Sequence, residues 1–121
     1  LEVIVEAMAC DPEFGLNFSE DHVFGIRLAD TQWVGGAFDP TYTPTFLEGK
    51  VACIERFMRP AHNGAAPILV SGDSGGDVAM LSTYSDALRL VYDCNRTGSI
   101  AEFISSDQPR CVVQPRTQYS K

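Results

Sequence analysis

The amino-acid sequence predicts an α/β fold with a mainly parallel sheet, arranged as a Rossmann-like three-layer sandwich. One observation is that helical and extended apolar patterns alternate along the chain, as they do in parallel sheets. Another is a short apolar run that stops at a cluster of glycines and aspartates. The composition agrees, because 121 residues with 45% hydrophobic and 21% charged residues suit one globular core.

Apolar spacing predicts the first elements. One face of a helix, ending near Cys10, is formed by Leu1, Ile4, Val5 and Met8. A strand is expected at residues 22–28. Residues 29–48 are rich in Gly, Pro and Thr, so we expect an irregular excursion or a small antiparallel ribbon there.

Six further elements continue the alternation. They are a helix at 49–58 ended by Pro60, a strand at 67–70, a helix at 76–83, a strand at 87–92, a helix around residues 100–104 with Thr97 as a possible N-cap, and a strand at 111–113. Because residues 67–70 are apolar throughout, we expect that strand to be buried on both faces.

Charge and cysteine content exclude several classes of protein. The formal net charge is −7, from 9 Lys+Arg against 16 Asp+Glu, which argues against nucleic acid or an anionic membrane surface as the main partner. No apolar run is long enough to predict a membrane span. The four cysteines, Cys10, Cys53, Cys94 and Cys111, form no Cys-x-x-Cys pair, so free thiols are favoured over disulfides and over a zinc site.

Residues 68–81 are the segment that indicates chemistry. An apolar strand leads into Asp73, and Asp77 follows in the first turn of the next helix. The glycines between and before them allow a tight turn, and two carboxylates around such a turn can converge on Mg²⁺. The alternative is purely structural, with Asp73 as a turn residue and Asp77 as a helix-start acid favoured by the helix dipole.

The same letters also admit a serine hydrolase. Gly72-Asp73-Ser74-Gly75-Gly76 is similar to the nucleophile segment of chymotrypsin-like proteases, in which Ser74 would attack with help from a histidine. The two histidines, His22 and His62, lie in no matching context, and the alternation of helices and strands disagrees with an all-β fold. This interpretation is therefore the weaker one.

The segment from Gly72 to Leu81 resembles the fourth motif of the haloacid dehalogenase superfamily of phosphatases, Gly-Asp-Ser-x-x-Asp-x-x-Met-Leu. Gly49-Lys50, about 20 residues before the strand of that motif, resembles the third motif. The match runs through nearly the whole of residues 1–121 and is similar to the carboxyl-terminal part of the core domain in the phosphoserine-phosphatase-like branch. Within that branch it looks closest to phosphocholine and phosphoethanolamine phosphatases.

The resemblance implies a Mg²⁺-dependent phosphomonoester hydrolase. In the family, a carboxylate nucleophile forms an aspartyl-phosphate that water then hydrolyses. Asp73 would be a Mg²⁺ ligand, and Asp77 would bind the metal directly, bind it through water, or hold Lys50. Lys50 would offset negative charge on the nucleophile and the phosphoryl oxygens, and Ser74 would shape the metal loop. The implied substrate is a small phosphorylated molecule, phosphocholine-like in the branch named.

Two parts of the family's pattern are absent from this sequence. None of the aspartates has another aspartate two positions away, so the first motif with its nucleophile is missing, as are the second motif and the cap domain. We therefore expect the chain alone to be inactive and its sheet to expose unpaired edges, through which it could self-associate. A second hypothesis is a non-catalytic α/β interaction module derived from a phosphatase core. The sequence predicts no compartment.

Overall fold

A computed structural model of the chain describes residues 2–13, 15–29, 37–106 and 108–116. The chain divides into two compact units, Leu1–Thr45 and Phe46–Lys121. Each unit is described by itself. In the described residues, no helix has both the length and the apolar character needed to cross a membrane.

The first unit contains helix α1 (Glu2–Ala9) and the 3-10 turn η1 (Glu20–His22). The helix agrees with the predicted apolar spacing, although Ile4, Val5 and Met8 are about half exposed or more; Leu1 lies outside the described residues. An antiparallel bridge between Leu28 and Phe38 is consistent with the small ribbon expected in residues 29–48.

The strand predicted at residues 22–28 is wrong. In the described residues, only Leu28 of this segment takes part in a β-bridge, with Phe38, and no ladder extends through residues 22–28. The residues before it contact helix α1: the carbonyl of Ile26 accepts the amide of Glu2 at 3.2 Å, and the amide of Gly25 donates to the Glu2 carboxylate at 2.7 Å. Arg27 forms an ion pair with the same carboxylate. A side chain at position 25 would collide with Glu2, so glycine permits this close approach.

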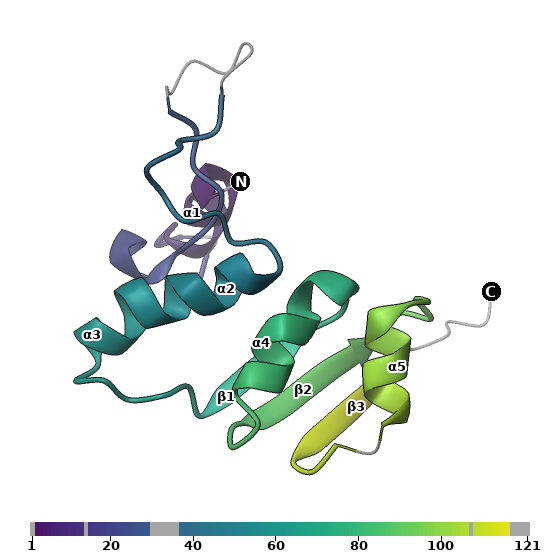
Figure 1. Ribbon diagram of the computed structural model, residues 1–121. Helices are drawn as coiled ribbons and strands as arrows, with labels where there is room; N and C mark the ends of the chain where they lie inside the picture. Colours follow the sequence, from purple (N-terminus) through teal and green to yellow (C-terminus); the bar gives the residue numbers. More distant parts are fainter. Residues whose placement is uncertain (1, 14, 30–36, 107, 117–121) are drawn as a thin grey trace, which may run out of the picture. The chain divides into compact units, whose positions relative to one another are not determined.

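The second unit is built on a three-stranded parallel sheet in the order β1-β2-β3 (Figure 1). The strands are β1 (Leu69–Gly72), β2 (Leu88–Asp93) and β3 (Cys111–Pro115), close to the predicted ranges. Because all three strands are parallel and helices connect them, the predicted Rossmann-like α/β fold is confirmed.

A helical stretch from residue 48 to residue 61 precedes the sheet. It consists of α2 (Glu48–Cys53), a π-helical turn η2 (Ile54–Met58) and α3 (Arg59–Ala61). The prediction that Pro60 ends the helix is wrong, because the helical stretch continues through Pro60 to Ala61. Just before Pro60 the amide of Arg59 reaches back to the carbonyl of Ile54 in the wider π turn.

Two more helices of this unit lie over one face of the sheet. The 3-10 turn η3 (Gly75–Asp77) leads into α4 (Val78–Thr83), and α5 (Ser99–Ser105) follows β2 (Figure 1). The N-cap of α5 is Gly98, not Thr97, because Gly98 takes a φ of 81° that favours glycine. The core between helices and sheet consists of Ile54, Val70, Leu81, Tyr84, Ala87, Val91, Ile100 and Phe103.

In the described residues of the second unit, the opposite face of the sheet is exposed, so the expected burial of residues 67–70 on both faces is wrong. The strand register places five exposed apolar side chains on this face: Leu69, Leu88, Leu90, Tyr92 and Val112. We call these five the open sheet face. The described residues therefore supply a helical layer and a sheet, and the third layer of the predicted sandwich is not among them.

Candidate functional site

The candidate site lies at the carboxyl end of β1, where ligands bind in open α/β sheets. The chain turns there through Asp73 and Ser74 into η3, and Asp77 organises the turn. One carboxylate oxygen of Asp77 accepts the amides of Asp73 at 3.1 Å and Ser74 at 3.0 Å, together with the Ser74 hydroxyl at 2.8 Å. Ser74 and Asp77 form a capping box, so both residues stabilise the start of the helix.

Gly72 makes this compact turn possible. A Cβ atom at position 72 would lie 2.3 Å from Cβ of Asp77, which is far inside van der Waals contact. At position 75 an added Cβ would meet the Ser99 hydroxyl at 2.8 Å, whereas at position 76 nothing lies closer than 3.7 Å. Of the glycines in the motif, Gly72 is thus the one that the position of Asp77 requires.

Lys50 comes to the same carboxylate from another element, 27 residues away in the chain. It lies in α2, which packs against α4, and its ammonium forms an ion pair with the second oxygen of Asp77. Burial alone would raise the pKa of Asp77, but hydrogen bonds from Lys50, Ser74 and the Asp73 amide outweigh burial and lower that pKa below its ordinary value. The structure thus brings together Lys50, Ser74 and Asp77 in one hydrogen-bonded network.

Asp73 points away from this network. Its side chain is 44% exposed, and one of its oxygens accepts a hydrogen bond from Nη2 of Arg96 at 2.9 Å. The thiol of Cys94 lies 4.0 Å from the same oxygen. Sequence reasoning missed Arg96. The signal for it is topological, because Arg96 is in the loop after β2, and β2 is the parallel neighbour of β1.

These residues fit Mg²⁺ in part. Mg²⁺ takes one or two carboxylates and completes its shell with water and substrate phosphate, and the accessible Asp73 can be one such ligand. Asp77 was a second candidate ligand, but both of its oxygens already accept hydrogen bonds within the chain. No cluster of three or more His, Cys, Asp or Glu side chains suited to a metal occurs in the described residues. Asp73 is therefore the candidate ligand that the turn presents outward.

The serine-hydrolase interpretation finds no support in the geometry. The Ser74 hydroxyl donates its hydrogen bond to Asp77, not to a histidine. The parallel α/β sheet is also a different fold from the all-β chymotrypsin-like proteases. Ser74 therefore acts in the described residues as a helix cap.

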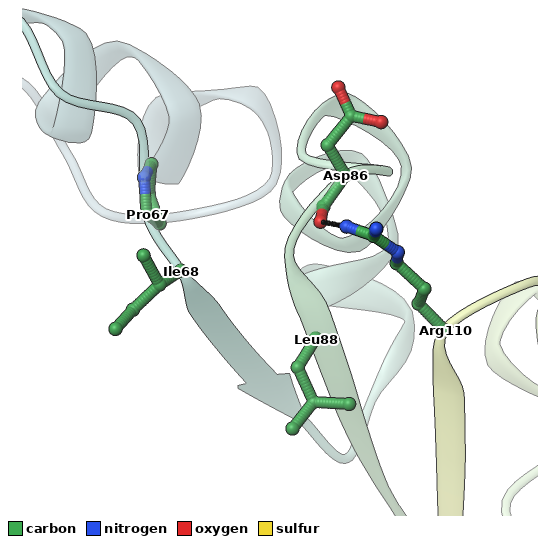
Figure 2. A pocket seen from close by; sticks show the side chains of 5 residues that line it. All are labelled: Pro67, Ile68, Asp86, Leu88 and Arg110. Atoms are coloured by element: carbon green, nitrogen blue, oxygen red, sulfur yellow. Dashed lines mark hydrogen bonds between the residues drawn. The ribbon is translucent and has the colours of Figure 1, made fainter.

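A shallow hollow of about 470 Å³ lies at the opposite end of the strands (Figure 2). It is lined by Pro67 and Ile68 before β1, Asp86 and Leu88 at the start of β2, and Arg110 before β3. Arg110 donates to the backbone carbonyl of Asp86 at 2.5 Å, which closes the gap between the two strands. Because this hollow is at the amino ends of the strands, it is separate from the turn that carries Asp73.

Comparison with known proteins gives one informative likeness. No protein-family model matches the chain, and no curated protein matches it. A crystal structure of a conserved protein of unknown function from Anaerococcus prevotii DSM 20548 superposes with a TM-score of 0.72 at 31% sequence identity. The match covers 84% of this chain and 27% of that one, so the chain spans roughly a quarter of the larger protein. This likeness supports the fold and assigns no activity.

Proposed function

We propose that the chain forms the lysine and metal-ligand part of a Mg²⁺-dependent phosphomonoester hydrolase of the haloacid dehalogenase type. The observation that carries the proposal is the contact between Lys50 and Asp77, made across 27 residues of sequence at the carboxyl end of β1. A capping box explains Ser74 and Asp77, but it needs no lysine from a distant helix. The resemblance of these residues to the third and fourth motifs connects the Lys50–Asp77 contact to phosphatase chemistry.

Each side chain then has a defined part. Asp77 holds Lys50 and orders the turn, so the ammonium is fixed beside the place where phosphate would bind. Asp73 faces solvent, where it can ligate Mg²⁺. When bound, Mg²⁺ would neutralise phosphoryl oxygens and orient them. The nucleophile would come from an Asp-x-Asp segment outside these 121 residues, so the whole protein would be the enzyme and this chain alone would be inactive.

The test is Mg²⁺-dependent hydrolysis of p-nitrophenyl phosphate and of phosphocholine by the full-length gene product. Lys50→Ala and Asp73→Asn should each lower kcat at least about 100-fold, the scale of losing one group that stabilises charge in the transition state. Asp86→Asn is the matched control, because Asp86 is an exposed aspartate at the other end of the sheet. Full activity in Lys50→Ala and Asp73→Asn would contradict the proposal.

The isolated chain provides the second arm. It should hydrolyse neither substrate, and hydrolysis that is lost in Asp73→Asn would show that the nucleophile lies within the 121 residues after all. If the full gene encodes no Asp-x-Asp segment, the non-catalytic interaction module is the better interpretation. The open sheet face favours that alternative, because five exposed apolar side chains form a surface suited to association.

A further inference from the structure

Arg96 occupies the place at Asp73 where a cation is expected. It lies in the loop between β2 and α5, and parallel pairing of β1 with β2 brings this loop beside the turn after β1. Its Nη2 is 2.9 Å from Oδ2 of Asp73. Neither the third nor the fourth motif includes this arginine.

The site therefore contains two carboxylates, and each has one cation of its own. Lys50 and Asp77 are the enclosed pair, with the carboxylate only 6% exposed. Arg96 and Asp73 are the accessible pair, with side chains 53% and 44% exposed. Because exposed ion pairs contribute little to stability, the second pair can exchange partners readily while the first holds the turn.

We propose that Arg96 holds the cation position of Asp73 in the metal-free chain and gives it up to Mg²⁺. This inference rests on the proposed function, since it takes Asp73 as a ligand of the metal. Once displaced, the guanidinium is free to bind the phosphate group of the substrate, and its planar set of donors suits two phosphate oxygens at once. Arg96 is thus a substrate-binding residue that becomes available when the metal is present.

Magnesium binding tests the exchange without any need for turnover. Isothermal titration of the full-length gene product with MgCl₂ compares the wild type with Arg96→Gln. Removing Arg96 should tighten Mg²⁺ binding about two- to five-fold, the range set by the weakness of an exposed ion pair. Arg59→Gln is the matched control: it removes the same charge from another exposed pair, with Glu55, and should leave the affinity unchanged. Far-UV circular dichroism confirms that the variants are folded.

Asp73→Asn separates failure of this inference from failure of the proposed function. If Asp73→Asn binds Mg²⁺ as the wild type does, or if no form of the full-length gene product binds Mg²⁺ at millimolar concentrations, Asp73 is not a ligand and both proposals fall. If Asp73→Asn abolishes binding but Arg96→Gln leaves it unchanged or weaker, the metal site stands and the exchange is overturned.

Inorganic phosphate tests the second half of the proposal. With Mg²⁺ at saturation for each variant, titration with phosphate should show binding by the wild type that is at least five-fold weaker in Arg96→Gln. Arg59→Gln should again match the wild type. Equal phosphate binding by the wild type and Arg96→Gln would refute the release of Arg96 to the substrate.

Discussion

Asp77→Asn should destabilise the chain by about 2 kcal/mol. The carboxylate accepts hydrogen bonds from Lys50, the Asp73 amide, the Ser74 amide and the Ser74 hydroxyl, and it is almost fully buried. In asparagine one of the two oxygens becomes an NH₂ group, so a donor must face either the ammonium or the amides. At least one hydrogen bond to a charged group is lost, which is worth about 1.5–3 kcal/mol. Lys50 is 31% exposed and can regain water, so the cost stays below the roughly 3–5 kcal/mol of a fully buried pair.

A double-mutant cycle with Lys50→Met isolates the contribution of the pair. Urea unfolding at pH 7, followed by far-UV circular dichroism, gives the free energy of unfolding of each variant. We expect about 2 kcal/mol for each single change, about 3 kcal/mol for both together and thus a coupling energy of about 1 kcal/mol. The control is the cycle of Glu55→Gln with Arg59→Gln, an exposed pair four residues apart in a helix, whose coupling should not exceed about 0.5 kcal/mol.

Additivity would refute this reasoning. If the two single changes sum to the effect of the double change within about 0.3 kcal/mol, Lys50 and Asp77 do not interact in solution. The proposed function would then lose the observation on which it depends. The capping box could still account for the cost of Asp77→Asn alone.

Three more outcomes follow from the same contacts. Gly72→Ala should lower the free energy of unfolding by about 1–3 kcal/mol, because the added methyl group collides with Asp77. Gly76→Ala has room for its methyl group and should lower the free energy of unfolding by less than about 1 kcal/mol. Urea unfolding measures both variants, and equal losses of stability would contradict the packing argument. Because the pKa of Asp77 is lowered in the folded chain, the ionised carboxylate stabilises the fold fully above the ordinary pKa of 3.8, and this stabilisation is lost as pH falls through the lowered value. Unfolding midpoints measured down to about pH 2 should therefore fall more steeply for the wild type than for Asp77→Asn. Parallel pH profiles of the two proteins would contradict this prediction. The purified chain should self-associate through the open sheet face. Light scattering after gel filtration should show a molar mass that rises with protein concentration in the wild type and equals that of the monomer in Leu90→Lys. A wild type that stays monomeric at all concentrations would contradict this prediction.

The order of elements in the second unit could be predicted from the sequence because short apolar runs and helical spacing are local signals. The strand at 67–70 and the helix at 76–83 were found within two residues of β1 and of η3 with α4. The wrong predictions concern strand pairing and the covering of a sheet face, which the local apolar pattern does not determine. Residues 22–28 have the apolar content of a strand, but a strand needs a partner along its length, and in the described residues only Leu28 is bridged to another extended segment, while Gly25 and Ile26 bond to Glu2 of α1. Apolar residues likewise mark a sheet face without showing that a layer covers it.

The candidate residues could be named from the sequence where they match a family motif, and not where only the topology brings them to the site. Lys50, Asp73, Ser74 and Asp77 were named from the resemblance to the third and fourth motifs, and the structure places three of them in one hydrogen-bonded network. Arg96 belongs to no motif, and only the parallel order of β1 and β2 shows that its loop ends beside Asp73. The outward position of Asp73 is also a structural result, because the sequence names both Asp73 and Asp77 as candidate ligands without showing which side chain faces solvent.

The spacing Ser-x-x-Asp alone cannot distinguish a metal loop from a helix cap, because both put Ser74 and Asp77 where they are. The residues that a helix cap does not need support the proposed metal loop. A helix cap does not require an ion pair between Lys50 of α2 and the second carboxylate oxygen of Asp77. It also does not require a second carboxylate, Asp73, that is accessible to solvent. Because Lys50 is paired with the buried carboxylate of Asp77, the accessible carboxylate of Asp73 and its partner Arg96 are the groups that a ligand can contact. Under the proposed function, Asp73 prefers Mg²⁺ to the Arg96 guanidinium, and magnesium binding measured with and without Arg96 tests that preference.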